Sequence, residues 1–316
     1  MFRIIPKPSF LLPLCFIVVQ QTIFSQELVR YGYEQPKMGT TFRIILYSED
    51  AEKAQKASDE AFQRIDQLNA IFGDYEEDSE ISQLSDLADT GTRQEVSPEM
   101  WEVLVLAKQI SKRSKGAFDI TIGPLSKLWR RAIRRNEFPS IENINEAKSK
   151  VNYRWLKLYK KKREVILKKE GMKLDAGGIA KGYAIDEAYK VLKSYGIDQA
   201  LVDGGGDIYV GLPPPGRKGW NLAFLTQGSD NVDQTVQLTN QAIASSGDTY
   251  KFIEWEGKRY SHIIDPRTGL GVIDQKVINV IASNGTLADA LASAISIMTE
   301  ERSKKLVKRY PNVELK

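Results

Sequence analysis

Cysteine and histidine are almost absent from this sequence, which has one of each, Cys15 and His262, among 316 residues. A single cysteine excludes a disulfide within the chain and a thiolate zinc cluster, and a single histidine excludes a metal centre built from several imidazoles. Carboxylates, hydroxyls, lysines and backbone groups remain for chemistry. These groups suit hard cations such as Mg²⁺ and ligands that carry phosphate.

A large excess of charge of either sign is also missing, because 45 Lys and Arg residues face 41 Asp and Glu residues, for a net charge of +4. This value is too small to indicate a nucleic-acid partner. Two local basic runs, residues 127–135 and 157–169, contain Trp129 and Tyr159, and Trp155 lies just before the second. We expect them to form solvated faces and predict no nucleic-acid binding, with docking to a membrane surface or a partner as the alternative.

Residues 1–25 have the layout of a secretory signal peptide. Arg3 and Lys7 precede an apolar stretch over residues 10–19, and a small residue, Ser25, ends the segment. The pattern predicts cleavage after Ser25 and export to the periplasm, either free or attached to the periplasmic face of the inner membrane; an uncleaved anchor is the alternative. Cys15 follows Leu14 rather than a small residue, so we assign it to the signal and not to a lipidation site.

Helical and strand patterns interleave over residues 26–316 without a linker or a repeat, which predicts one α/β (α+β) domain after the signal. We expect a helix that begins at Ser97-Pro98 and stops at about Gly116, since an N-cap residue followed by proline is a typical helix start. The other expected elements are a strand at 40–47, a helix to about Phe72, a polar turn region at 73–89, two strands within 151–168 joined by a basic turn at 160–163, and hairpins that turn at 204–206 and 256–258.

Residues 174–183 contain the first candidate site. The pattern predicts a strand that ends near Asp175, a turn at Gly177 and Gly178, and a helix that begins near Lys181. Glycines permit close backbone approach, and free N–H groups at a helix start attract phosphate, to which Lys181 adds a positive charge. The alternative is a tight strand-to-helix connection with an exposed lysine.

Two further segments give weaker signals. Gly204-Gly205-Gly206 has more glycine than a two-residue hairpin turn requires, so either a flat group lies against it or the hairpin is bulged. Residues 244–248 and 260–269 flank another hairpin and contain Asp248 and His262. We expect His262 to lie on a strand in phase with Tyr260 and Ile264, where a lone histidine is more often structural than catalytic.

Asp289 and Ser293 are four residues apart at the start of an apolar helical segment, so they share one face of the helix. A buried carboxylate and a hydroxyl need partners, and a hard cation would satisfy both. The alternative for Asp289 is a variant of the capping box with Thr286.

Eight segments in order resemble the ApbE family, the exported FAD:protein FMN transferases. They are Met38-Gly39-Thr40, residues 78–82, 116–119, 123–125 and 175–186, the triple glycine, and residues 262–269 and 289–293. The resemblance covers nearly the whole chain after residue 25. It implies a single ApbE-type, T-fold-like domain that binds FAD and Mg²⁺, splits the FAD diphosphate, attaches FMN to a Thr or Ser of an acceptor protein such as a membrane redox subunit, and releases AMP.

The resemblance also implies roles for particular residues. The metal ligands would be Asp289, Ser293 and the backbone oxygen of Ala180. Ala292 replaces a further acidic residue of some members, so the likeness does not extend to a second metal or to efficient FAD hydrolysis. The flavin nucleotide site would be lined by Met38, Tyr75, Ala117, Phe118, Asp119, Gly177, Lys181, Tyr183, His262 and Ile263.

Three residues are candidates for catalysis. Lys181 would neutralise phosphate charge, and Asp248 or His262 would orient the acceptor hydroxyl. Two other functions stay open at this point: hydrolysis of FAD to FMN and AMP, and flavin binding without turnover.

Overall fold

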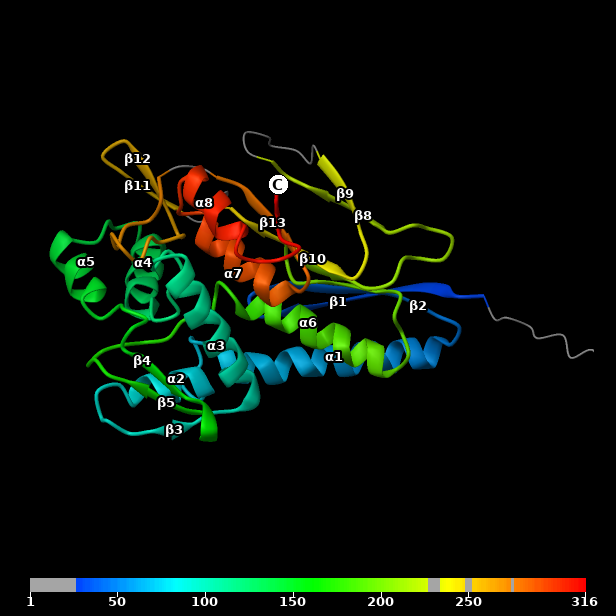
Figure 1. Cartoon of the computed structure of the whole chain (residues 1–316), viewed down its shortest axis with the longest axis horizontal. Helices are drawn as coiled ribbons and strands as arrows, with labels where there is room; N and C mark the ends of the chain where they lie inside the picture. Colours follow the sequence, from blue (N-terminus) through cyan, green and yellow to red (C-terminus); the bar gives the residue numbers. More distant parts are fainter. Residues whose placement is uncertain (1–26, 227–233, 248–251, 274–275) are drawn as a thin grey trace, which may run out of the picture.

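A seven-stranded antiparallel sheet forms the centre of the structure (Figure 1), a computed structural model that describes residues 27–226, 234–247, 252–273 and 276–316. Its strand order is β1-β2-β6-β7-β10-β13-β14, and every neighbouring pair is antiparallel. The strands are β1 (Val29–Lys37), β2 (Thr40–Ser48), β6 (Ala200–Asp203), β7 (Asp207–Val210), β10 (Gln241–Ser246), β13 (Ile278–Ala282) and β14 (Glu314–Leu315).

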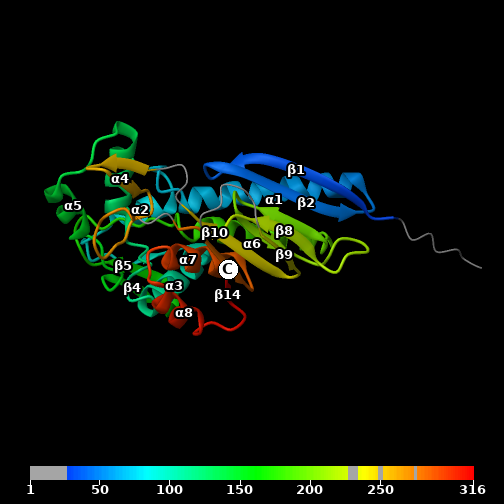
Figure 2. The same cartoon turned by 90° about the horizontal axis from the view of Figure 1, so that it is seen from above.

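The two faces of this sheet are covered differently (Figure 2). Three helices lie on one face, α1 (Ala51–Phe72), α6 (Ala180–Ser194) and α7 (Gly285–Ile295), and share one apolar core with alternate residues of the strands. The hairpin of β8 (Trp220–Phe224) and β9 (Gln234–Leu238) covers part of the other face through a separate cluster that includes Trp220 and Phe224. In β6, for example, Val202 belongs to the first core and Leu201 to the second, as the alternation of a strand requires.

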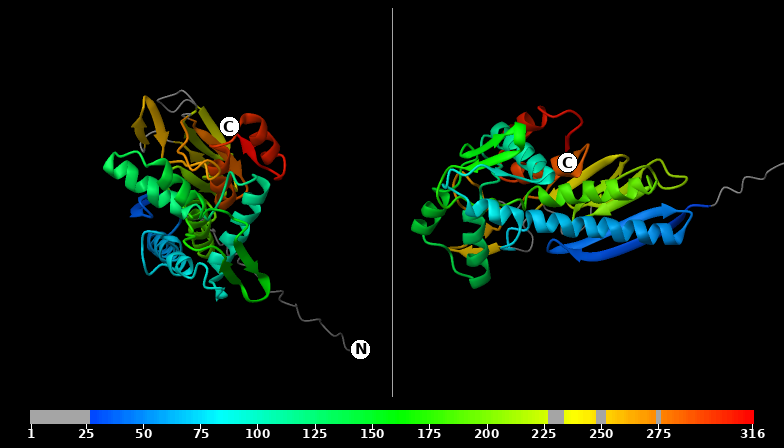
Figure 3. Two further views of the ribbon diagram at one scale, coloured as in Figure 1. Left: turned by 90° about the vertical axis from the view of Figure 1, so that its left-hand side faces the viewer. Right: turned by 90° about the horizontal axis from the view of Figure 1, so that it is seen from below.

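The remaining elements gather at the end of the molecule away from Val29 (Figure 3). One group contains α2 (Glu80–Asp86), α3 (Pro98–Arg113) and a small sheet of order β3-β5-β4. The other group contains α4 (Gly123–Arg135), α5 (Ile141–Lys148) and the β11–β12 hairpin. The strands are β3 (Gln94–Glu95), β4 (Leu156–Tyr159), β5 (Glu164–Leu167), β11 (Phe252–Trp255) and β12 (Lys258–Ser261); a short helix η1 (Lys160–Lys162) joins β4 to β5, and α8 (Glu300–Val307) follows α7.

Most expected elements are confirmed, including the α+β class, the helix that ends at Phe72, and the hairpins. Ser97 caps α3 by accepting a hydrogen bond from the Met100 N–H at 3.1 Å. The region 73–89 is corrected, because it contains α2 with Ser79 as its N-cap. Thr286 is not the cap of α7, since the Asn284 side chain accepts from Leu287 N. The strand expected before Asp175 is a single bridge between Ile122 and Lys173.

The helices in the described ranges include none that is long and apolar enough to span a bilayer. The predicted signal over residues 1–25 lies outside the described residues and stays a prediction.

α6 and α7 cross at unusually short range because both helices have glycine at the contact. A Cβ at Gly182 would lie 2.2 Å from the backbone oxygen of Gly285, and a Cβ at Gly285 would lie 2.6 Å from the oxygen of Gly182. Asp186 of α6 joins the two helices, because its carboxylate accepts from Gly285 N at 2.6 Å and from Thr286 N and Oγ1 at 2.9 and 2.6 Å. The start of α7 is therefore fixed to the first turns of α6.

We predict that Gly182→Ala lowers the free energy of unfolding by about 1–3 kcal/mol or more, because the new methyl group overlaps the backbone of α7. Gly32→Ala in β1 is the matched control, since a Cβ there meets no atom within 4 Å. Urea unfolding of the two variants makes the comparison. Equal stability of both variants would contradict the close crossing.

Candidate functional site

Three charged residues meet where α6, α7 and β7 begin. Lys181 comes from the first turn of α6, Asp207 is the first residue of β7, and Asp289 lies one turn into α7. Lys181 Nζ forms an ion pair with Asp207 Oδ2, whose side chain is almost completely buried. Asp289 Oδ2 accepts a hydrogen bond from Gly182 N at 3.0 Å. The close crossing of α6 and α7 thus positions Asp289 beside the residue that follows Lys181.

The environment of this cluster changes the acidity of its members. Burial, together with the nearby charge of Asp207, raises the pKa of Asp289 to about 7 despite the opposing effect of Lys181. Burial by itself disfavours the charged form of Lys181, but the carboxylates of Asp207 and Asp289 outweigh it and raise the lysine pKa. Lys181 therefore keeps its positive charge, and Asp289 is a carboxylate whose negative charge is incompletely compensated.

The other two predicted ligands, Ser293 and Ala180, belong to α7 and α6, the helices that cross at Asp289. Ser293 follows it by one helical turn, and Gly178 brings the glycine loop against Ser293, where a Cβ would lie 2.7 Å from the Ser293 Oγ. Ala180, the third predicted ligand, is the first residue of α6 and is buried. A carboxylate, a hydroxyl and backbone oxygens are the ligands that Mg²⁺ prefers, so the residues present fit this ion.

The described part of the chain contains no group of three or more His, Cys, Asp and Glu side chains placed to hold a metal. A site at Asp289 would therefore depend on one carboxylate and on neutral oxygen ligands. The position of Gly178 against the Ser293 hydroxyl was not predicted. Its only signal in the sequence was the glycine pair itself.

Arg130 of α4 connects the glycine loop to the loop after α1. Its guanidinium contacts Asp175 Oδ2 at 2.7 Å and Asp74 Oδ2 at 2.5 Å. Asp175 Oδ1 in turn accepts from Gly177 N at 2.7 Å, which holds the turn. Tyr75, next to Asp74, is 62% exposed, and its hydroxyl donates to Asn69 Oδ1 at 2.5 Å. Arg130 thus connects the segments that carry two predicted flavin contacts, Gly177 and Tyr75. It belongs to the basic run for which we expected only a solvated face.

The turn between β1 and β2 lies against the triple glycine. Met38 and Gly39 form this turn with positive φ angles of 48° and 75°. The next residue, Thr40, packs so closely on Gly205 that a Cβ there would lie 2.2 Å from Thr40 Oγ1. The group that lies against the triple glycine in this structure is therefore a turn of the same chain.

Residues 117–119 are all buried, and two of them have structural contacts. Phe118 lies beside Gly178, where a Cβ would be 3.4 Å from its ring. Asp119 accepts from Thr121 N and Oγ1 at 2.9 and 2.7 Å and from Tyr153 N at 2.8 Å, while burial raises its pKa. Its carboxylate therefore holds the surrounding loops together. The predicted contacts of Ala117, Phe118 and Asp119 with FAD stay predictions.

Tyr183 is a predicted flavin contact whose side chain points away from Lys181. Two residues further along a helix, its side chain leaves α6 on the opposite side. Its hydroxyl donates to Glu102 of α3 at 2.9 Å, and its ring packs edge-on against Phe72. It lines a cavity of about 460 Å³ together with Asp186 and Thr286, so these contacts give no support to its predicted role.

His262 does not lie on a strand, which corrects the expected alternation with Tyr260 and Ile264. β12 ends at Ser261, and His262 occupies an exposed bend after it. The next residue, Ile263, donates its N–H to Ser261 Oγ at 3.0 Å. Asp248, the other candidate for orienting a hydroxyl, lies outside the described residues, so both roles stay predictions.

The segment after His262 has the plain turn contacts that its sequence indicates. Asp265 accepts from the backbone and the guanidinium of Arg267. Arg267 also donates to the oxygen of Ile297, just beyond the end of α7, at 2.9 Å. The loop that carries His262 is therefore attached to the helix that carries Asp289.

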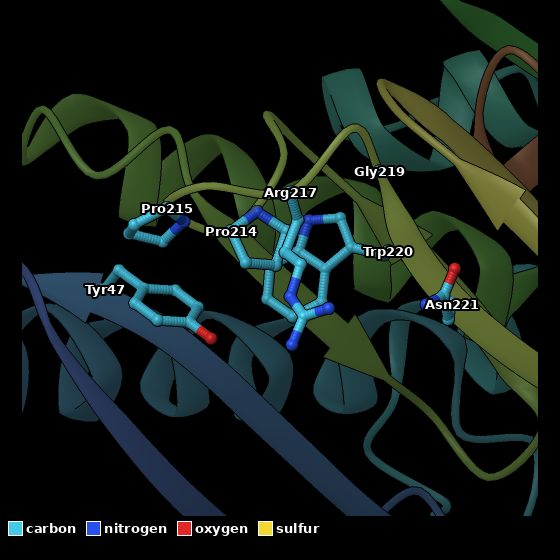
Figure 4. A pocket seen from close by; sticks show the side chains of 7 residues that line it. All are labelled: Tyr47, Pro214, Pro215, Arg217, Gly219, Trp220 and Asn221. Carbon is cyan, nitrogen blue, oxygen red and sulfur yellow. The ribbon is translucent and has the colours of Figure 1, made fainter.

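A cavity of about 430 Å³ lies on the other face of the sheet (Figure 4). Tyr47 of β2, Trp220 of β8 and the loop residues Pro214, Pro215 and Arg217 line it. The rings of Tyr47 and Trp220 pack with centroids 6.0 Å apart. None of the predicted site residues lines this cavity, so it is separate from the Lys181–Asp289 cluster.

The acidity of Asp289 predicts a pH effect on stability. An aspartate in an unfolded chain has a pKa of about 3.9. Between this pH and about 7, Asp289 is protonated in the folded protein but ionised in the unfolded chain, so the folded state binds one more proton. The stabilisation from this proton is present at low pH and is lost as the pH rises through about 7. Without divalent cations, Asp289→Asn should therefore melt several degrees above the parent at pH 8, and the difference should shrink towards pH 5.

Thermal unfolding in the presence of a chelator measures this effect. Asp86→Asn, which removes an exposed carboxylate on α2, is the control and should show no such dependence. Equal melting temperatures of Asp289→Asn and the parent at both pH values would show that Asp289 is not a strained buried charge.

Comparison with known proteins identifies relatives over most of the chain. A profile of the ApbE family matches residues 38–315. The FAD:protein FMN transferase of Treponema pallidum is 31% identical over 69% of this chain, and that of Escherichia coli K12 is 30% identical over 68%. These matches span 65% and 63% of the lengths of those two relatives.

Solved structures show the same architecture. The ApbE protein of Thermotoga maritima superposes with a TM-score of 0.81 at 29% identity, over 91% of this chain and 93% of its own. The flavinyl transferase ApbE of Pseudomonas stutzeri, in its apo form, gives 0.79 at 26% identity, over 90% of this chain and 89% of its own. The profile and the fold agree, and the chain belongs to the ApbE family.

Proposed function

We propose that this chain is an Mg²⁺-dependent FAD:protein FMN transferase. In the reaction, the hydroxyl oxygen of a Thr or Ser of an acceptor protein forms a bond to the phosphorus nearer to riboflavin. The bond from that phosphorus to the AMP oxygen breaks, the hydroxyl proton is lost, and AMP leaves with the electron pair. The observation that supports the proposal most strongly is the cluster of Lys181 and the buried Asp289, with Ser293 one helical turn further along α7, in a chain of the ApbE family.

Each member of this cluster has a definable task. Asp289, Ser293 and the backbone oxygen of Ala180 would hold Mg²⁺, which supplies Lewis-acid stabilisation of phosphate charge. Lys181 keeps its proton because Asp207 raises its pKa, so it acts as a fixed positive charge and not as a base. A phosphate transfer with a loose transition state needs mainly such positioning and charge stabilisation.

The flavin nucleotide would lie at the predicted contacts, from Met38 and Tyr75 to Gly177 and Ile263. Asp248 or His262 would orient the acceptor hydroxyl. Arg130 holds Asp175 and Asp74 and thereby keeps the glycine loop in place for the diphosphate. We further propose that the chain is exported and modifies a membrane redox subunit on the periplasmic side.

Incubation of the purified chain with FAD, Mg²⁺ and a candidate acceptor from the membrane redox subunits of the same organism tests this function. Covalently yellow acceptor protein with AMP supports transfer. Free FMN with AMP would instead indicate hydrolysis, and intact FAD would indicate flavin binding without turnover; either outcome with a competent acceptor would reject the proposal.

Asp289→Ala should abolish transfer, because it removes the only carboxylate proposed to bind the cation. Fluorescence of the acceptor in a denaturing gel measures covalent flavin. Asp86→Ala on α2 is the control, since it removes an exposed carboxylate away from the cluster. Substantial flavinylation by Asp289→Ala with Mg²⁺ present would refute the metal assignment.

Ser293 allows a graded test of the same site. Ser293→Ala should raise the Mg²⁺ concentration needed for half-maximal transfer at least about tenfold, whereas Ser293→Thr, which keeps a hydroxyl, should stay close to the parent. The measurement is a titration with Mg²⁺ at saturating FAD. A Ser293→Ala variant with the Mg²⁺ requirement of the parent would exclude the hydroxyl as a ligand.

A further inference from the structure

The solvent-exposed side of α4 is a row of basic side chains. Lys127, Arg131, Arg134 and Arg135 are all exposed, while Leu125, Leu128, Trp129 and Ala132 form the buried side. Because their spacing is that of a helix, the four basic residues share one face. The helix therefore presents positive charge over most of its length to solvent.

These four side chains differ from Arg130 on the same helix. Within the part of the chain that the structure describes, none of them has an ion pair, whereas Arg130 on the edge of the same face contacts two carboxylates. In the second basic run, residues 157–169, the lysines also have no ion pair within the described residues, but the arginine is partnered. There Arg163 lies 3.6 Å from Glu95, and Arg93 from the neighbouring segment stacks on Tyr159.

Two exposed apolar side chains lie on the elements that pack against α4. Trp255 at the tip of the β11–β12 hairpin is 46% exposed, and Ile141 at the start of α5 is 74% exposed. Trp255 stacks on Phe138 at 5.4 Å, and Phe138 packs edge-on against Trp129 of α4 at 5.5 Å. The hairpin is therefore attached through three rings to Trp129 on the buried side of α4, which places it next to this helix.

This surface lies at one end of the molecule. Figures 1 and 2 show α4, α5 and the hairpin together at the end opposite to the one where the chain enters β1. We call six residues at this end the α4 surface: Lys127, Arg131, Arg134, Arg135, Ile141 and Trp255. Acidic residues border it at Glu137, Glu142 and Glu254, but the exposed side of α4 itself has none.

We propose that the α4 surface docks the protein on an anionic phospholipid membrane. Lipid headgroups complement the four unpaired basic side chains, and the layer beneath them accepts a tryptophan and an isoleucine. A nucleic acid would complement the same charges but offers no apolar layer for Trp255 and Ile141. The docking does not require the transferase activity proposed above.

Docking would also bring the candidate site close to the bilayer. Arg130, on the edge of the same helix, contacts the glycine loop through Asp175. If the proposed function holds, a membrane-bound acceptor would then meet the enzyme in two dimensions rather than by free diffusion. This consequence alone rests on the proposed function.

Cosedimentation with vesicles of phosphatidylcholine, with and without phosphatidylglycerol, tests the proposal on the purified chain that begins at Gln26. Binding is expected only with phosphatidylglycerol and should weaken as salt is raised. The combined variant Arg131→Gln, Arg134→Gln, Arg135→Gln should lower the partition coefficient about a hundredfold. The control, Lys160→Gln, Lys161→Gln, Lys162→Gln in η1, loses the same charge elsewhere and should bind nearly as the parent does.

Tryptophan emission provides a second measurement. It should shift to the blue when the parent binds phosphatidylglycerol vesicles, and Trp255→Phe should lose most of that shift. An equal loss of binding in the two triple variants would indicate unspecific charge attraction and overturn the proposal. Absence of binding to either vesicle would also overturn it and would direct the search to an acidic protein partner.

Discussion

The close crossing of α6 and α7 is the constraint on which the candidate site depends. Because neither Gly182 nor Gly285 has a side chain, the two backbones approach so closely that a carboxylate of each helix accepts hydrogen bonds from the backbone of the other. Asp186 of α6 accepts from the first N–H groups of α7, and Asp289 of α7 accepts from the Gly182 N–H. The backbone therefore places Lys181 next to Asp289, and the ion pair with Asp207 orients the lysine side chain, as electrostatic catalysis requires.

The buried carboxylates of this region differ in how well their charges are compensated. Asp186 accepts three hydrogen bonds at the start of α7, and Asp207 has the ammonium of Lys181. Burial raises the pKa of all three carboxyl groups. For Asp289, burial and the nearby charge of Asp207 raise the pKa to about 7, because one backbone N–H and the shared charge of Lys181 compensate its charge only in part. A buried charge with so few partners destabilises the fold. A cation bound there would relieve this cost, so cation affinity and stability are coupled.

Local signals in the sequence predicted most of the fold. The helical spacing of apolar residues predicted α1, and the N-cap and proline at Ser97-Pro98 predicted the start of α3. The helix after Ser79 was missed because it is only seven residues long and lies among polar residues. The strand β1 was missed because its sequence contains Gly32 and Pro36; its extended form depends on pairing with β2 along nine residues, which no local pattern records.

The site was predictable only where one element supplies both partners. The spacing of Asp289 and Ser293 follows from a helical turn, whereas Arg130 meets Asp74 and Asp175, which are 56 and 45 residues away in the chain. Tyr183 shows that residues of one sequence motif need not face the same site. Two residues on a helix point about 200° apart, so the segment that directs Lys181 towards the site must direct Tyr183 towards α3. One motif therefore serves two purposes: Gly178 and Lys181 build the site, and Tyr183 and Asp186 pack the helices that hold it.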